Sequence, residues 1–313
     1  MPSPLDILSV GELLVDLIGE APADALAETT VFRKQPGGSA ANLACNAARL
    51  GGAVALVAAV GDDSLGPWLR AHVEATGVDA AAVTTVAQTP TTAVLVARTT
   101  GTPDFTAYRG ADAELEPADL PNGLCQRPRI FHTTCFALSH APARATILEA
   151  AAVAAQHGVT LSLDANYAPA IGPDRAAAQY TVQRYCQHGA LVKLSADDIA
   201  RLFGDGTAPN DAIATVHSWG APLVCVTRGG DGTHISWEGG EQSAEIPATP
   251  VTIRGEATGA GDAFWAGFLM AHLNGQGPVD CATAGSRVAA RKLSTDGPLP
   301  SSIDPAILSA DSA

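Results

Sequence analysis

Lysine, aromatic residues and positive charge are scarce in this sequence of 313 residues. Three lysines occur, aromatic residues make up 5%, and 18 Lys and Arg stand against 32 Asp and Glu, a formal net charge of −14. Such a surface repels nucleic acid and anionic membranes, and no basic run or basic amphipathic helix offsets it. We therefore expect neither nucleic acid nor a membrane as a partner.

Several common motifs are also missing. The start of the chain has no basic segment followed by an apolar one, and no apolar run is long enough to span a membrane, so we expect a cytoplasmic protein. None of the six cysteines forms a C-x-x-C pair, which favours buried, reduced thiols. No Gly-x-x-x-x-Gly-Lys-Ser/Thr element occurs, which disfavours a P-loop nucleoside triphosphatase.

What the sequence does contain is a repeated alternation of short apolar runs with longer Ala-rich segments. Hydrophobic residues make up 47% of the chain, enough for one large core. The alternation predicts a mostly parallel sheet covered by helices. The expected strands are Leu5–Val10, Ala53–Val60, Ile130–Thr133, Thr160–Asp164, Leu191–Leu194 and Leu223–Thr227. The expected helices are Ala40–Leu50, Trp68–Thr76, Ala143–His157, Arg175–His188, Ala196–Phe203, Asn210–Trp219, Ala263–Leu273 and Cys281–Leu293.

Two segments, Leu13–Phe32 and Thr89–Tyr108, interrupt this alternation with strand-like patterns and turns instead of helices. They are consistent either with a small antiparallel sheet that stands off the main sheet as a lid, or with two separate peripheral hairpins. No linker rich in Pro, Gly or Ser divides the chain, and no internal repeat occurs, so we expect a single domain over residues 1–313.

The run Thr258-Gly259-Ala260-Gly261-Asp262 precedes an apolar segment that predicts a buried helix. A bare loop at a helix start points several N–H groups at one spot, which suits a phosphate or the negative charge of phosphoryl transfer. Asp262 stands where a carboxylate can take a proton from an attacking hydroxyl. The alternative is a helix N-cap aspartate after a tight turn.

Other polar residues follow the expected strands, where open parallel sheets bind their ligands. Asp16 follows the first strand, Gly37-Gly38 opens the helix that carries Asn42, and Thr227 begins a second glycine-rich turn. We expect two half-sites, one for a neutral polyol at Asp16 and Asn42 and one for a phosphate chain. The alternative is that Asp16 only accepts a turn hydrogen bond and Gly37-Gly38 only leads into a helix.

Taken in order, Gly-Gly-x-x-x-Asn, Gly-Asp-Asp-x-x-Gly, Thr-x-Gly-x-x-Gly and Thr-Gly-Ala-Gly-Asp resemble the motifs of the ribokinase-like (PfkB) carbohydrate kinases, from Val10 to about Ser301. The resemblance implies a three-layer α/β/α core with a mostly parallel sheet and a small antiparallel β-sheet lid, formed here by about residues 13–33 and 89–110. It implies transfer of the ATP γ-phosphoryl group to a sugar hydroxyl with Mg²⁺, and often with K⁺. It also implies a homodimer formed through the lid.

The resemblance assigns roles to individual residues. Asp262 matches the general base, and Gly259, Ala260 and Gly261 match the anion hole. The remaining matches are the sugar-binding Asp16, Gly37, Gly38 and Asn42, and the nucleotide-phosphate turn at Thr227, Gly229 and Gly232. Segments around Arg109, Asn166, Lys193 and Ser195 are similar to the branch of fructokinases and 2-keto-3-deoxygluconate kinases. This similarity implies that Arg109 and Asn166 bind the substrate and that Lys193 and Ser195 bind the nucleotide. The alternative for Arg109 is a solvated surface residue.

Three departures from the family pattern bear on function. Glu256 and Ala257 replace an Asp-Thr pair, which implies an altered or absent site for a monovalent cation at Glu256. Ser195 and Asp198 replace the Asn and Glu that organise Mg²⁺, so Asp198 would act on Mg²⁺ through water. Ala168 replaces an arginine, which disfavours a carboxylated sugar.

The expected activity is that of an ATP-dependent kinase of fructokinase type, acting on a neutral sugar with fructose as the first candidate. The alternatives are a kinase for 2-keto-3-deoxygluconate, a nucleoside or another specialised sugar, and a sugar-binding relative with weakened catalysis.

Overall fold

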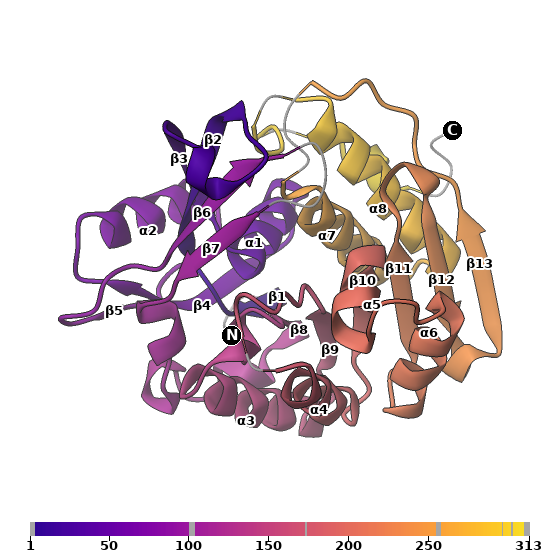
Figure 1. Cartoon of the computed structure of the whole chain (residues 1–313). Coiled ribbons are helices and arrows are strands. Elements are labelled where there is room, and N and C mark those ends of the chain that lie inside the picture. Colours follow the sequence, from indigo (N-terminus) through magenta and orange to yellow (C-terminus); the bar gives the residue numbers. More distant parts are fainter. Residues whose placement is uncertain are drawn as a thin grey trace.

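The computed structural model describes residues 4–99, 104–172, 174–254, 258–295, 297–301 and 303–309. Its main sheet has nine strands in the order β13-β12-β11-β10-β9-β8-β1-β4-β5 (Figure 1). The strands are β1 (Leu5–Val10), β4 (Val54–Gly61), β5 (Val83–Val86), β8 (Pro128–Thr134), β9 (Thr160–Asp164), β10 (Leu191–Ser195), β11 (Leu223–Thr227), β12 (Thr233–Trp237) and β13 (Gln242–Ile246). All neighbours from β5 to β11 pair in parallel, while β12 and β13 pair antiparallel at one edge.

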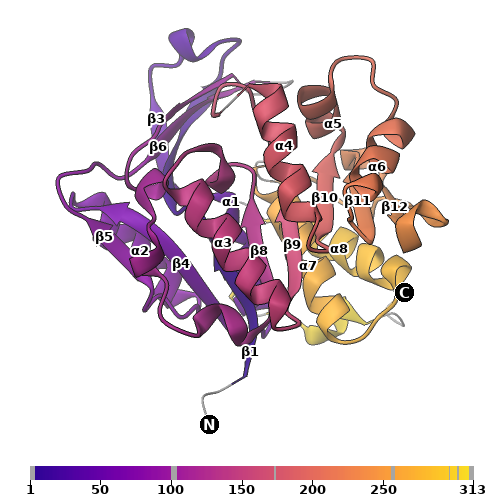
Figure 2. The same ribbon diagram turned by 90° about the horizontal axis from the view of Figure 1, so that it is seen from below.

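Helices cover both faces of this sheet, as Figures 1 and 2 show. One hydrophobic cluster joins the sheet to α3 (Ala143–Gln156), α4 (Arg175–Cys186), α5 (Ala196–Phe203) and α6 (Pro209–Ser218). A second cluster joins the opposite face to α1 (Ser39–Arg49), α2 (Leu65–Ala75), α7 (Ala260–Leu273) and α8 (Pro278–Leu293). The predicted mostly parallel sheet and its three-layer α/β/α arrangement are therefore confirmed.

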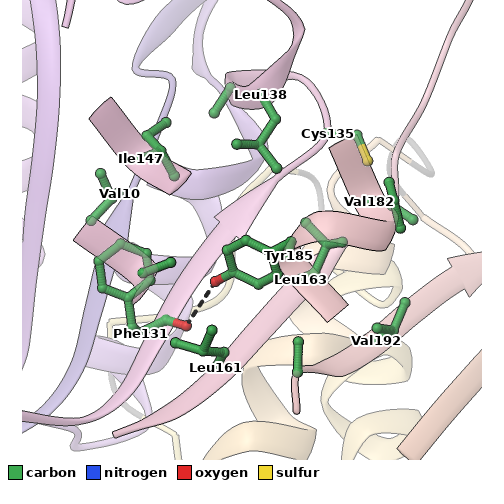
Figure 3. Packing of buried hydrophobic residues seen from close by; sticks show 14 of the residues in the cluster. Val10, Phe131, Cys135, Leu138, Ile147, Leu161, Leu163, Val182, Tyr185 and Val192 are labelled. Carbon is green, nitrogen blue, oxygen red and sulfur yellow. Dashed lines mark hydrogen bonds between the residues drawn. The ribbon is translucent and has the colours of Figure 1, made fainter. Parts of the chain in front are cut away.

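The central strands are buried along almost their whole length because helices cover both faces of the sheet. All eight residues of β4 are buried, for example. On one face, Figure 3 shows Phe131, Leu161 and Ile147 packed around Tyr185, whose hydroxyl donates to the carbonyl oxygen of Phe131 at 3.4 Å. On the other face, the indole N–H of Trp265 donates to the Ser162 hydroxyl at 2.8 Å, which places α7 directly against β9.

A second sheet of four strands stands off the main sheet, in the order β3-β2-β6-β7 (Figure 1). Its strands are β2 (Leu14–Pro22), β3 (Phe32–Gly37), β6 (Ala93–Arg98) and β7 (Phe105–Tyr108). The pairs β2–β3 and β6–β7 are antiparallel hairpins, and β2 joins β6 in parallel. The two interrupting segments thus share one sheet, as expected, and do not form separate hairpins.

Several element bounds differ from the expectation, and helices α2 and α8 each start three residues earlier than expected, at Leu65 and Pro278. The edge strands β5, β12 and β13 have no counterpart among the expected strands, because their sequences mix polar and apolar residues and form no apolar run. Helix α7 starts at Ala260, earlier than expected, because a positive φ of 79° at Gly259 turns the chain directly into the helix. No described helix is long and apolar enough to cross a membrane.

Candidate active site

Asp262 lies in the first turn of α7, where it meets the start of α1. Its Oδ1 accepts a hydrogen bond of 2.6 Å from the Ser39 hydroxyl, and its Oδ2 accepts one of 2.9 Å from the Asn42 side-chain amide. Figure 1 shows the two helices side by side. The glycine-rich run at residue 259 and the Gly-Gly run at residue 37 therefore build one site.

A buried carboxylate holds the start of α1 in place. Glu12 is 1% exposed, and its Oε1 accepts hydrogen bonds from the amides of Ser39 at 2.8 Å and Ala40 at 3.3 Å. Its Oε2 accepts a hydrogen bond of 2.7 Å from the hydroxyl of Thr134 in β8. These amides would otherwise lack partners, as at any helix start, and a negative charge there is favourable. Glu12 thereby positions the helix that holds Asp262.

Two glycines keep this junction compact. Gly38 has a φ of 99°, and a Cβ there would lie 2.4 Å from the carbonyl oxygen of Glu12. A Cβ on Gly37 would lie 2.1 Å from Oδ2 of Asp16. Larger residues at either position would therefore displace a carboxylate-bearing segment of the site.

Burial raises the pKa of Asp262 to about 6, and the charge of Asp164 adds to the rise. The hydrogen bonds from Ser39 and Asn42 and the nearby charge of Lys193 act in the opposite direction. Burial also raises the pKa of Glu12, to about 7, against the hydrogen bond from Thr134. A carboxylate with a pKa just below neutrality is well suited to accept a proton in a reaction near pH 7.

A buried ion pair lies beside the glycine turn. The Lys193 ammonium is 2.8 Å from both carboxylate oxygens of Asp164, and the two side chains are 5% and 2% exposed. A Cβ on Gly261 would lie 3.2 Å from Lys193 Nζ, so the ammonium borders the predicted anion hole. Burial alone would lower the pKa of Lys193, but the carboxylates of Asp164, Asp198 and Asp262 outweigh burial and raise it.

Ser195 and Asp198 form the N-terminal capping box of α5. The Ser195 amide and hydroxyl each donate to Oδ2 of Asp198 at 2.7 Å, and the Asp198 amide donates to the Ser195 hydroxyl at 3.0 Å. Burial raises the pKa of Asp198 to about 6. Among the described residues, no group of three or more His, Cys, Asp or Glu is placed to hold a metal ion.

The predicted sugar-binding and nucleotide-binding residues fall into separate groups. Asp16 and Asn42 line one cavity of about 300 Å³ together with Gly259. Thr227 lies opposite Ser195 at the ends of β11 and β10, and the turn after it has positive φ at Gly229 and Gly232. A Cβ on Gly232 would lie 2.2 Å from the carbonyl oxygen of Ile246, so this turn is closely packed.

Arg109 and Asn166 both contact the segment at Phe136. The Arg109 guanidinium lies 4.2 Å from the centroid of the Phe136 ring and pairs with Asp112 at 2.6 Å, and its side chain is 10% exposed. The Asn166 side-chain oxygen accepts a hydrogen bond from the Phe136 amide at 3.3 Å. Arg109 is thus a packed residue and not a solvated one, and neither residue lines the cavity that contains Asp16. Glu256 lies outside the described residues.

Two residues that hold the site together were not among the expected site residues. Ser39 and Glu12 act across the fold, over 223 and 27 residues of sequence, so no local pattern identifies their partners. The available signals were an acidic residue two positions after the first strand and a hydroxyl directly after the Gly-Gly pair.

Comparison with known proteins agrees with this geometry. Residues 5–304 match the model of the pfkB family carbohydrate kinases. An ATP-dependent 6-phosphofructokinase of Thermoanaerobacterium thermosaccharolyticum is 31% identical, over 92% of this chain and 88% of the relative. Fructokinase-1 of Oryza sativa subsp. japonica is 33% identical, over 82% of this chain and 80% of the relative.

Among solved structures, the fructokinase of Halothermothrix orenii superimposes with a TM-score of 0.75 at 30% identity, over 91% of this chain and 96% of that one. Sequence motifs, the three-layer core and the family match agree with one another. The chain therefore belongs to the pfkB family of carbohydrate kinases and is an ATP-dependent sugar kinase.

Proposed function

We propose that the protein transfers the γ-phosphoryl group of ATP to a hydroxyl of a ketohexose, with fructose as the first candidate. The observation that carries this proposal is the Asp262 carboxylate, which is held by Ser39 and by Asn42, and Asn42 lines the same cavity as Asp16. The fructokinases among its relatives support fructose as the acceptor.

In the proposed reaction, the acceptor oxygen bonds to the γ-phosphorus while the bond to the β,γ-bridging oxygen breaks and its electron pair leaves with ADP. The proton of the hydroxyl passes to Asp262, which therefore must start ionised. The amides of Gly259, Ala260 and Gly261 would donate to the transferring group, because they lie at the start of α7 where the helix dipole is positive. The Lys193 ammonium would add positive charge on the Gly261 side.

Asp16 and Asn42 would bind the sugar hydroxyls, and Gly37 and Gly38 would keep room for them. Arg109 and Asn166 contact Phe136 in this structure, so they would reach the substrate only through that segment or after it shifts.

The nucleotide would lie along the ends of β10 and β11, with Thr227, Gly229 and Gly232 around its phosphates and Lys193 and Ser195 beside them. Mg²⁺ would neutralise the phosphate charge, held by the phosphates themselves and through water by Asp198, since Mg²⁺ sites of this kind need only one or two carboxylates. A requirement for K⁺, which the family resemblance implies, would appear as lost activity when tetramethylammonium replaces K⁺.

The pH dependence of turnover tests the role of Asp262. Activity should fall as the pH drops through about 6, because protonated Asp262 cannot accept the hydroxyl proton. Ser39→Ala removes a hydrogen bond that lowers the pKa of Asp262, so the acidic limb of the kcat/KM profile should move to higher pH. An unchanged limb in Ser39→Ala would contradict the assignment.

Incubation with ATP, Mg²⁺ and a panel of sugars, sugar acids and nucleosides tests the proposed function directly. We expect ADP and a fructose phosphate, with a higher kcat/KM for fructose than for 2-keto-3-deoxygluconate or any nucleoside. A higher kcat/KM for one of those compounds would identify it as the acceptor in place of fructose. Sugar binding in calorimetry without transfer to any acceptor would instead identify a relative with weakened catalysis.

We also propose that the small sheet acts as a lid within a single domain, and that two copies pair through it. Val31 and Tyr108 support this, because both are large apolar residues of this region and are 56% and 63% exposed. A monomer in sedimentation at micromolar concentration would contradict the dimer. We also propose that the protein is cytoplasmic, because ATP is made and used there.

A further inference from the structure

Lysine is scarce in this acidic chain, yet two of its three lysines are buried beside the glycine turn at residues 259–261. Lys193 and Lys292 are 4% and 7% exposed, whereas Lys34 is exposed. Lysine is seldom buried to this degree, because its charge then loses most of its hydration. The gathering of both buried lysines at one turn therefore indicates a purpose for positive charge at that place.

Close packing of two helices brings Lys292 to this turn. Helices α7 and α8 follow one another along the chain and lie side by side (Figure 1). A Cβ on Gly267 would lie 2.7 Å from a methyl carbon of Val288. A Cβ on Gly285 would lie 2.8 Å from the carbonyl oxygen of Phe264. Glycine at these two positions permits the close approach, and the end of α8 that carries Lys292 therefore lies against the start of α7.

The Lys292 side chain and the Asp262 carboxylate border the same point. A Cβ on Gly259 would lie 3.9 Å from Cε of Lys292 and 4.0 Å from Oδ2 of Asp262. Lys292 also lines the cavity that contains Asp16 and Asn42. The ammonium, one bond beyond Cε, therefore lies near the place where the proposed base, the anion hole and the acceptor cavity meet.

Lys193 and Lys292 border the turn at different glycines. Lys193 Nζ borders Gly261 and makes two contacts of 2.8 Å with Asp164, so it belongs to a buried ion pair. Lys292 borders Gly259 and extends from the last turn of α8 to the wall of the cavity. A buried cation acts on a nearby charge more strongly than an exposed one, because little water screens it. Negative charge on a phosphoryl group at this turn would therefore meet an ammonium at each of its two glycines.

We propose that Lys292 is a further catalytic residue, whose ammonium binds the transferring phosphoryl group at the Gly259 side of the anion hole. The inference rests on the proposed function and deepens it by one residue. The bonds and the proton follow the scheme given above, and Lys292 keeps all its protons and supplies only charge and N–H donors. Such a group accelerates transfer when it binds the transition state more tightly than bound ATP. The alternative role is to offset the negative end of the α8 dipole.

Lys292→Met tests the proposal, because methionine replaces the apolar stem of lysine and suits a buried position. With the acceptor that the sugar panel identifies, kcat should fall by about 10²- to 10³-fold, the loss expected when one donor to a developing negative charge is removed. The KM for that acceptor should change much less, since Asp16 and Asn42 remain. Arg291→Met is the matched control, because Arg291 is the neighbouring basic residue in the last turn of α8 and is exposed. Equal losses in both variants would overturn the proposal in favour of the dipole effect.

Binding of a transition-state mimic separates this role from a structural one. MgADP with tetrafluoroaluminate and the acceptor imitates the transferring group, and calorimetry gives the dissociation constant of the complex. Lys292→Met should weaken this complex by about the same factor as kcat, while the dissociation constant for MgADP alone changes little. Equal weakening of both would overturn the proposal, because Lys292 would then support nucleotide binding or the fold and not the transition state.

Chemical rescue tests the charge itself in a second variant, Lys292→Ala, which leaves room for a small amine. Methylammonium should restore part of the lost kcat, whereas tetramethylammonium, which is larger and has no N–H donor, should not. No rescue in a variant that still binds MgADP would contradict a role for the ammonium. Unchanged kcat in Lys292→Met would overturn this inference and leave the proposed function standing. A wild type that phosphorylates no acceptor would overturn the proposed function itself.

Discussion

Asp262→Asn is expected to lower kcat by about 10²- to 10⁴-fold, the range attributed to a positioned general base. The substitution removes the group that takes the hydroxyl proton but keeps the shape of the side chain. The new amide can still accept a hydrogen bond from the Ser39 hydroxyl, and rotation of the Asn42 amide would restore the second one. Steady-state kinetics with saturating ATP measures the loss.

The dissociation constant for the sugar should change little, because Asp16 and Asn42 are still present to bind it. Asp280→Asn is the matched control, since Asp280 occupies the first turn of α8 as Asp262 occupies that of α7. The control separates the effect of losing the proton acceptor from the effect of losing a negative charge at a helix start. Full activity of Asp262→Asn would exclude Asp262 as the base.

Lys193→Met is expected to destabilise the fold by about 3–5 kcal/mol, because it leaves the buried carboxylate of Asp164 without its partner. Urea unfolding followed by circular dichroism measures the change. The double variant Lys193→Met/Asp164→Asn should recover much of the lost stability, since the uncompensated charge is then gone.

Arg70→Met tests whether burial is the reason. This substitution breaks the ion pair between Arg70 and Glu74, whose side chains are 40% and 51% exposed, respectively. It should lower the free energy of unfolding by no more than about 1 kcal/mol. A Lys193→Met protein as stable as Arg70→Met would show that the Lys193–Asp164 pair contributes little to folding.

The main sheet and its helices were predictable from sequence because their signals are local. The bounds of β9, β11 and α5 agree with the expected ones, since apolar runs and the change from period 2 to period 3.6 mark them directly. The edge strands β12 and β13 carry no such signal. They are five residues each and alternate with glycine turns, so only their pairing to β11 makes them strands.

The site was predictable in part. The glycines at residues 259 and 261 and the carboxylate of Asp262 indicated where an anion and a base would lie. The sequence order of the motifs pointed to Asn42 as part of the same site. The hydrogen bonds that hold Asp262 depend on contacts between α1 and α7, which no local pattern encodes. At Asp198 a local signal existed, because Ser-x-x-Asp is a capping box, and the structure uses both residues that way.

A crystal structure of the protein with a ketohexose and a non-hydrolysable ATP analogue tests the central claim most directly. The account predicts the acceptor hydroxyl within hydrogen-bond distance of Asp262, between Asp16 and Asn42, with the γ-phosphate analogue at the amides of residues 259–261. A sugar bound elsewhere, or an acceptor hydroxyl directed away from Asp262, would contradict it.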